Sequence, residues 1–322
     1  MSIYDNPLFA TLAGIKNVFV RGEPIGSLRE DMRREGGVAL VTGASSGLGF
    51  AIAAELARRG MQVYGAARTA TAEVTQALRE AAGVDTIEML AVDLSDLRSI
   101  EALVETLAGK LEGRALELVV CNAALVPTGD KRTPQGLEQM FVVNYLAKQA
   151  LLEGLRGRGL FADKARRPRV VIVSSEAHRN AKDRPLDSFG EYQGFTIGEV
   201  LERYGMYKLA LTTFGQELAR RLEPEDIAVH TMCPGAVNSK VARDAPGWAQ
   251  PLIKVAFRLF FQDPKQAAEP VLFLALAPEL DGQTGLYLHQ WVKKDPDART
   301  LEPERGRAQW ETTAALLEQH AS

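Results

Sequence analysis

The stretch VALVTGASSGLGFAIAAELARRG, residues 38–60, decides the fold that we expect for this chain. Its first six residues, VALVTG (38–43), are mostly apolar or β-branched, which predicts a short buried strand. From Leu48 onward apolar residues recur at helical spacing, which predicts a helix. The segment TGASSGLG (42–49) between them carries three glycines, so the backbone can turn sharply from the strand into the helix.

The same alternation continues along the chain. Further apolar runs predict strands at 61–67, 86–94, 116–124, 169–175, 227–235 and 285–289. Amphipathic helical stretches separate these runs, among them 97–111 and 142–155, which indicates a parallel sheet covered on both faces. We therefore predict an α/β fold, a single doubly wound (Rossmann) domain with a parallel sheet of about seven strands. Its ligand crevice is expected at the carboxyl ends of the strands.

The domain boundaries follow from where this alternation begins and ends. We expect the Rossmann-type catalytic domain at 37–290, an N-terminal extension at 1–36 and a C-terminal helical extension at 291–322. Each extension is too short to form a core of its own. The charged and Gly/Pro-containing segment 176–203 is expected to form a long excursion, and such loops are usually functional or mobile.

Charge and composition exclude several classes of function. A net charge of −3 offers no basic footprint, so we expect no nucleic-acid partner. Two cysteines are too few for a disulfide framework and fit a reducing compartment. Since no signal peptide and no apolar run of ~18 residues is found, we expect a cytoplasmic protein without a transmembrane span. Peripheral membrane contact and the oligomeric state stay open. The histidines have no metal-ligand spacing, so no metal is predicted.

The glycine-containing turn predicts a dinucleotide-binding site. Its glycines allow the backbone to approach a pyrophosphate, and the following helix offers free N–H groups and a positive dipole end. The residues expected at the phosphates are Gly43, Ser45, Ser46, Gly47, Leu48 and Gly49. The segment 43–47 also matches the Gly-x-Ser-x-Gly elbow of hydrolases, but no earlier strand exists to supply an oxyanion hole. The hydrolase interpretation is therefore weak.

A second motif, YGMYK (204–208), predicts acid–base chemistry. Tyr204 and Lys208 are four residues apart and share one face of a helix that we expect to begin at Tyr204. A positive charge near a phenol lowers its pKa from the usual ~10. Tyr207 lies on another face and is expected to be a packing residue.

Further motifs follow in a fixed order. They are the pair 93–94, CNAA (121–124), VVNYLA (142–147), VIVSSEAH (171–178) and PGAVNS (234–239). With the glycine turn and YGMYK, this series resembles the short-chain dehydrogenase/reductase family over about residues 37 to 290. The segments around 121–124 and 144, the YxxxKLA helix and the tail 285–298 resemble its retinol dehydrogenase-like branch, which is itself similar to protochlorophyllide reductase.

The resemblance implies a catalytic tetrad of Asn144, Ser175, Tyr204 and Lys208. Tyr204 would be the general acid in reduction and the base in oxidation. Lys208 would lower the tyrosine pKa and hold the nicotinamide ribose, and Ser175, rather than Ser174, would bond the substrate oxygen. Asn144 would fix a helix backbone and a water of the proton relay.

The resemblance also implies residues that line the cofactor. Asp93 would accept from the adenine amino group, with Leu94 beside the ring. The other lining residues implied are Asn122, Ala123, Ala124, Tyr204, Lys208, Pro234, Gly235, Val237 and Ser239. Ala124 and Ser239 depart from the family's usual Gly and Thr.

The cofactor is predicted to be NADP(H). An NAD site needs a carboxylate at the end of the second strand to bond the ribose 2′-hydroxyl. Here that end reads GAART (65–69), without a carboxylate, and Arg68 can pair with a 2′-phosphate.

The substrate is predicted to be an apolar small molecule. The segment 245–262 is rich in aromatic and aliphatic residues, so it is either a substrate lid, a helix packed on the core, or a contact to a membrane or a second subunit. We therefore expect an enzyme that interconverts an apolar ketone or aldehyde and its alcohol. The alternative is a catalytically silent NADP(H)-binding regulatory or assembly protein, which has no need of the complete tetrad.

Overall fold

A mixed sheet of eight strands organises the protein. The computed structural model describes residues 22–127, 129–162, 164–182, 188–192, 194–196, 199–235 and 262–320. The strands are ordered β3-β2-β1-β4-β5-β6-β7-β8. They comprise β1 (Val38–Thr42), β2 (Gln62–Ala67), β3 (Ile87–Ala91), β4 (Leu118–Cys121), β5 (Arg169–Val173), β6 (Ala228–Cys233), β7 (Tyr287–His289) and β8 (Val292–Lys293).

The pairing confirms the predicted doubly wound sheet. All neighbours from β3 to β7 are parallel, with Ala39 opposite Val63 on one side and Leu118 on the other. The eighth strand, β8, is a two-residue antiparallel addition that follows a tight turn after β7. The strand order reverses between β1 and β4, and ligands of such sheets bind at this switch point.

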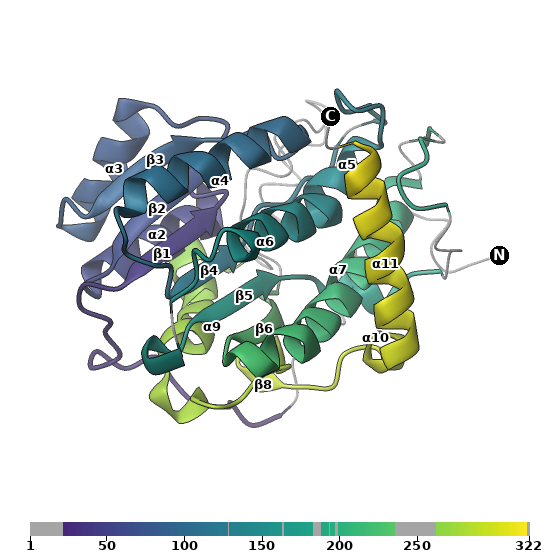
Figure 1. Ribbon diagram of the computed structural model, residues 1–322. Coiled ribbons are helices and arrows are strands. Elements are labelled where there is room, and N and C mark those ends of the chain that lie inside the picture. The colour runs from purple at the N-terminus through teal and green to yellow at the C-terminus, as the bar shows by residue number, and fades with distance from the viewer. Residues whose placement is uncertain are drawn as a thin grey trace, which may run out of the picture.

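Helices cover both faces of the sheet (Figure 1). Their buried side chains form one core under α4 (Leu97–Leu111), α6 (Ala147–Gly157) and α7 (Val200–Leu222). A second core lies under α2 (Gly47–Arg58), α3 (Ala72–Ala82) and α9 (Pro264–Leu276) on the other face. Because the central strands β1 and β4 are buried on both sides, their sequences are almost continuously apolar rather than alternating.

Local signals set several helix ends. The Thr71 side chain caps α3 by accepting from Val74 N, and Gly83 ends this helix at φ 70°, where glycine carries no steric cost. Asp96 caps α4 in the same way, by accepting from Arg98 N. These short-range bonds hold the connections that bring each strand back into the sheet.

Two helices differ from the sequence-based expectation. The helix expected to begin at Tyr204 begins at Val200, so Tyr204 lies in its second turn. The helix expected at 142–155 consists of α5 (Gln139–Phe141), the π-helical turn η2 (Val142–Leu146) and α6. Residue periodicity does not encode a π turn, because tertiary contacts rather than spacing select it.

The C-terminal residues pack on the α7 side of the sheet. Helix α10 (Ala298–Leu301) leads into α11 (Pro303–Gln319), which crosses α7 (Figure 1). The Trp310 ring stacks on Phe214 of α7, with ring centroids 5.5 Å apart. Arg221 lies over the same indole, with its Cζ 4.3 Å from the ring centroid. This contact buries an apolar face of α7 that would otherwise be exposed.

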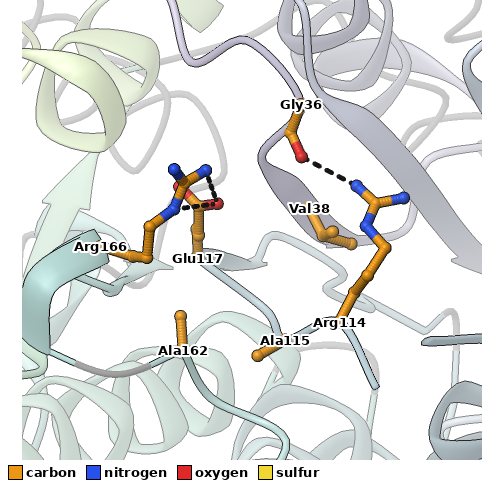
Figure 2. Close-up of a pocket in the computed structure, with 7 residues that line it drawn as sticks. All are labelled: Gly36, Val38, Arg114, Ala115, Glu117, Ala162 and Arg166. Carbon is orange, nitrogen blue, oxygen red and sulfur yellow. Dashed lines mark hydrogen bonds and ion pairs between the residues drawn. The ribbon is translucent and has the colours of Figure 1, made fainter. Parts of the chain in front are cut away.

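At the amino edge of the sheet, a shallow pocket is lined by charged residues (Figure 2). Glu117, which directly precedes β4, pairs with Arg166 at 2.5 Å and with Arg34 at 3.5 Å. Arg114 donates to the Gly36 carbonyl at 2.8 Å. This pocket lies opposite the carboxyl ends of the strands, so we assign its charges to stability rather than to the ligand site.

Candidate active site

The glycine turn has the geometry of a phosphate cradle. Gly43 and Gly47 adopt φ 72° and 58°, which L side chains rarely tolerate. A Cβ at Gly49 would lie 2.3 Å from the Gly43 carbonyl oxygen, so only glycine fits there. The Ser46 side chain makes no cap at the start of α2, which leaves the amides of this helix end for an anion. The turn therefore fits the diphosphate of a dinucleotide.

The end of β4 is tied to this turn. Thr42 Oγ1 accepts from the backbone N–H groups of Asn122 and Ala123, at 3.0 and 3.2 Å. Asn122 Nδ2 in turn donates to the Thr42 carbonyl at 3.0 Å. These bonds span the switch point of the sheet. They place Asn122 and Ala123 beside the glycines, and Ala124 follows directly in the chain.

The residues expected near the adenosine lie at the ends of β2 and β3. Arg68 directly follows β2 and is exposed. Asp93 lies two residues beyond β3, and its Oδ1 accepts from Ser95 N at 2.9 Å and from Ser95 Oγ at 2.7 Å. Leu94 is buried in the core next to it. Asp93 thus shapes its own loop, in addition to any contact with a base.

Asn144 lies in the π-helical turn and is fully buried. Its Oδ1 accepts from Leu125 N at 3.0 Å, and its Nδ2 donates to Leu125 O at 2.7 Å. The side chain is therefore engaged as a clamp on the loop after β4. π-Helical turns are common at functional sites. Here the π turn directs the Asn144 amide toward the loop after β4.

Ser175, Tyr204 and Lys208 converge at the carboxyl end of β5. The Ser175 side chain lies close enough to the Tyr204 phenol to lower the pKa of that phenol. The Lys208 ammonium lies 5.5 Å from the centroid of the Tyr204 ring and donates to the Val173 carbonyl at 3.1 Å. Ser174 instead bonds Thr212 Oγ1 at 2.7 Å inside the core, so of the two serines only Ser175 faces the tyrosine.

The electrostatics of this group are governed by burial. Burial raises the pKa of Tyr204, the neighbouring Cys233 raises it further, and the Ser175 side chain opposes both. The expected lowering of this pKa by Lys208 is not seen, because the ammonium faces Val173 O and the ring rather than the phenol oxygen. Burial also lowers the pKa of Lys208, to about 8.

Tyr207 has the packing role expected of it. Its ring packs on Phe141 with centroids 5.5 Å apart, and its hydroxyl donates to Glu138 Oε2 at 2.5 Å. Arg203 pairs with the same carboxylate at 3.1 Å. The Tyr207 hydroxyl is therefore directed into this buried network and away from Ser175.

A second buried lysine, Lys148, is not among the site residues expected from the sequence. Lys148 Nζ donates to the Ala123 carbonyl at 2.7 Å and to the Val143 carbonyl of the π turn. Burial, and next the charge of Lys208, lowers its pKa to about 7. The available signal was a lysine four residues after Asn144, on an otherwise apolar helix face. Lys148 and Asn144 together hold the backbone of residues 123–125 through hydrogen bonds.

The remaining expected residues follow β6. Cys233 Sγ accepts from Gly235 N at 3.4 Å, and Gly235 has φ 78°, so the chain turns sharply after Pro234. Val237, Ser239 and residues 245–261 lie outside the described part of the chain.

Within the described residues, no cluster of His, Cys, Asp or Glu has the arrangement of a metal site. None of the described helices combines the length and apolar character needed to cross a bilayer.

Comparison with known proteins identifies the family. The sequence profile of short chain dehydrogenase matches residues 37–184. Retinol dehydrogenase 12 from Bos taurus is 31% identical over 294 residues, covering 91% of this chain and 90% of that protein. Retinol dehydrogenase 14 from Homo sapiens is 29% identical over 299 residues, covering 88% and 86%. The chain therefore belongs to the short-chain dehydrogenase/reductase family, and it resembles the retinol dehydrogenase-like branch, as expected.

Solved structures agree on the fold. An uncharacterized protein from Mycobacterium Paratuberculosis superimposes with a TM-score of 0.69 at 22% identity, covering 92% of this chain and 98% of that one. A complex of Pseudomonas aeruginosa RhlG with NADP gives 0.59 at 24% identity, covering 80% and 96%. The family membership supports an alcohol or carbonyl oxidoreductase that uses a nicotinamide dinucleotide.

Proposed function

We propose that this protein is an NADP(H)-dependent oxidoreductase that interconverts an apolar ketone or aldehyde and its alcohol, with Tyr204 as general acid and base. The observation that carries the proposal is the meeting of Ser175, Tyr204 and Lys208 at the carboxyl edge of the sheet. This group lies at the same edge as the glycine turn. A silent nucleotide-binding protein has no physical need for this arrangement.

Each side chain has a distinct task in the proposed reaction. The nicotinamide supplies or accepts the hydride when bound. Ser175 Oγ bonds the substrate oxygen, and the Tyr204 phenol delivers a proton to that oxygen in reduction or removes it in oxidation. Lys208 holds the ribose hydroxyls, and its ammonium lies beside the Tyr204 ring, 5.5 Å from the ring centroid. Asn144 and Lys148 keep the loop after β4 in place beneath the cofactor.

The preference for NADP(H) rests on the end of β2. Ala67 occupies the last position of the strand, where an NAD-binding site presents a carboxylate. Arg68 follows it and is exposed at the same edge, so its guanidinium can form a bidentate pair with a 2′-phosphate. The apolar substrate class rests on the composition of 245–262, and we retain the cytoplasm as the proposed location.

The test replaces the proton donor. Tyr204→Phe keeps the ring but removes the exchangeable proton, and general acid catalysis contributes typically 10²–10⁴-fold, so kcat should fall by about that factor. NADPH binding and the melting temperature should change little. Turnover is followed by NADPH absorbance with a panel of apolar aldehydes and ketones, which also defines the substrate.

Tyr207→Phe is the matched control. It removes a hydroxyl from a buried network, so stability should drop by about 1–3 kcal/mol while kcat is largely kept. If Tyr204→Phe turned over normally and Tyr207→Phe did not, the assignment of the site would be wrong. If the wild type bound NADPH but reduced none of the panel, the silent alternative would be favoured.

A further inference from the structure

The short turn after Ser175 is held by the C-terminal part of the chain. This turn, η4 (Glu176–Asn180), is followed by Ala181. Three hydrogen bonds connect it to residues 295–299, which follow β8 and include the start of α10. Arg179 Nη2 donates to Asp295 O at 2.7 Å, Asp297 N donates to His178 Nε2 at 3.1 Å, and Arg299 Nη1 donates to Ala181 O at 2.8 Å. We call this set of bonds the clasp.

The central bond of the clasp, from Asp297 N to His178 Nε2, determines which ring nitrogen of His178 carries the proton. Because the Asp297 backbone N–H is the donor, Nε2 of His178 must be an acceptor and therefore unprotonated. The other nitrogen, Nδ1, lies 2.7 Å from the Ser175 carbonyl, which can only accept. The ring is thus a neutral imidazole with its proton on Nδ1, fully buried, with its edge against Tyr287.

His178 therefore joins the C-terminal segment to the Ser175 backbone. The same turn contacts the tyrosine helix, since a Cβ at Gly205 would lie 3.0 Å from the Ala177 carbonyl oxygen. Ser175 Oγ also accepts from Ala177 N at 3.2 Å, so the position of the turn sets the direction of the serine hydroxyl. A shift of the turn would change the distance between Ser175 and Tyr204.

We propose that the clasp made by residues 295–299 positions Ser175 for the reaction, with His178 as the neutral link. The C-terminal segment then contributes to the active site by fixing the position of Ser175. This inference rests on the proposed function, because it assumes that Ser175 bonds the substrate oxygen. His178 is a positioning residue, since it acts through the Ser175 backbone.

The clasp is sensitive to acid. Protonation of Nε2 would set an N–H against the Asp297 N–H and break the central bond. Burial lowers the pKa of His178 below its ordinary value, and the charge of Arg179 acts in the same direction. The bond to Ser175 O and the carboxylates of Glu176 and Asp297 oppose this, and His289 and Tyr287 face the ring from β7. The clasp should therefore open only at a pH lower than the ordinary histidine pKa of about 6.5.

A proline can remove the decisive N–H with little other change. Asp297 has φ −55°, close to the roughly −65° that proline requires. Asp297→Pro deletes the donor to His178, and with it the carboxylate that caps α10 and pairs with Arg299. Asp297→Ala deletes the same carboxylate but keeps the N–H. The difference between the two variants isolates the central bond of the clasp.

We expect kcat at pH 8 to be about tenfold lower in Asp297→Pro than in Asp297→Ala, since small misplacement of reacting groups is costly. NADPH affinity should be equal in the two. The ratio of the two kcat values should approach one well below pH 6.5, because acid opens the clasp of Asp297→Ala as well. A general loss of stability would not produce this convergence. Equal kcat values at pH 8, or a ratio independent of pH, would overturn the proposal.

A measurement without any variant keeps the proposal testable if Asp297→Pro fails to fold. Imidazole ¹⁵N NMR of the wild type, which has four histidines, reports the tautomer of His178. The Nδ1–H form is expected, and the Nε2–H form would contradict the clasp. Failure of the proposed function is recognised separately, by an active Tyr204→Phe. If Tyr204→Phe is inactive and the two Asp297 variants are alike, only the clasp is wrong.

Discussion

Buried charged side chains have different partners at the two edges of the sheet. At the amino edge, Glu117 pairs with Arg166 (Figure 2) and with Arg34. Arg169 pairs with Asp281 at 2.7 Å. At the carboxyl edge, the amines of Lys148 and Lys208 are bonded to backbone carbonyls. Within the described residues, neither lysine forms an ion pair with a carboxylate.

This difference separates a stabilising network from a reactive one. A buried cation beside a carboxylate keeps its charge, whereas a buried amine bonded only to carbonyls loses its proton more easily. The pKa values of Lys208 and Lys148 accordingly fall to about 8 and about 7. Groups with such shifted pKa values concentrate at functional sites. Changes at the carboxyl edge should therefore affect activity, and changes at the amino edge should affect stability.

The largest effect is expected from Lys208→Met. The substitution keeps an apolar side chain of similar length but removes both the proposed ribose contact and the positive charge near the Tyr204 ring. We expect kcat to fall at least about 10²-fold and NADPH affinity to weaken as well. Steady-state kinetics and nucleotide fluorescence measure the two losses. A variant that lost neither would contradict the role of this lysine.

Glu117→Gln should show the opposite pattern. It removes the carboxylate charge with which Arg34 and Arg166 both pair. Because Arg166 is half exposed and its pair is partly screened by solvent, we expect the free energy of unfolding to fall by only about 2 kcal/mol. Urea denaturation measures this loss. Turnover should be unchanged, since the pocket is remote from the proposed chemistry. A tenfold drop in kcat without unfolding would break the distinction between the edges.

Arg68→Ala tests the exposed cation of the carboxyl edge. We expect NADPH affinity to fall about tenfold, roughly 1.4 kcal/mol, while NADH affinity stays the same. Titration of both nucleotides by fluorescence gives the ratio directly. Equal affinities for the two nucleotides in the wild type, or an unaltered preference in the variant, would contradict the assignment of the 2′-phosphate site.

The smallest expected effect is that of Lys148 on the pH dependence of stability. Its pKa is about 7 in the folded protein and 10.5 as a free side chain, so between these values the unfolded chain binds more protons. Stability should therefore rise with pH in this window. Lys148→Met should reduce the slope by about 1 kcal/mol per pH unit, measured by urea denaturation at several pH values. Lys110→Met, which removes a partly exposed amine paired with Glu88, should leave the slope unchanged.

Much of the fold could be predicted from local sequence. The α4 helix has the predicted bounds, Leu97–Leu111, because its apolar spacing is regular and Asp96 caps it. The strands agree within a few residues, since buried parallel strands are continuously apolar. The start of α7 was predicted four residues late, because Val200–Arg203 lacks a cap and is held by tertiary contacts such as that between Arg203 and Glu138.

Sequence by itself determined the parallel sheet, the glycine turn and the pairing of Tyr204 with Lys208 on one helix. The glycine turn and the Tyr204–Lys208 pair depend on residues close together in the chain, where backbone geometry fixes their relation. The parallel sheet follows from the regular alternation of apolar runs with amphipathic helices. Only the tertiary structure decided that Lys148 meets Ala123, that Asn144 clamps Leu125, and that Asp297 reaches His178. These bonds join segments far apart in the chain, and the low dielectric of the packed interior shifts the pKa values of the groups that it encloses.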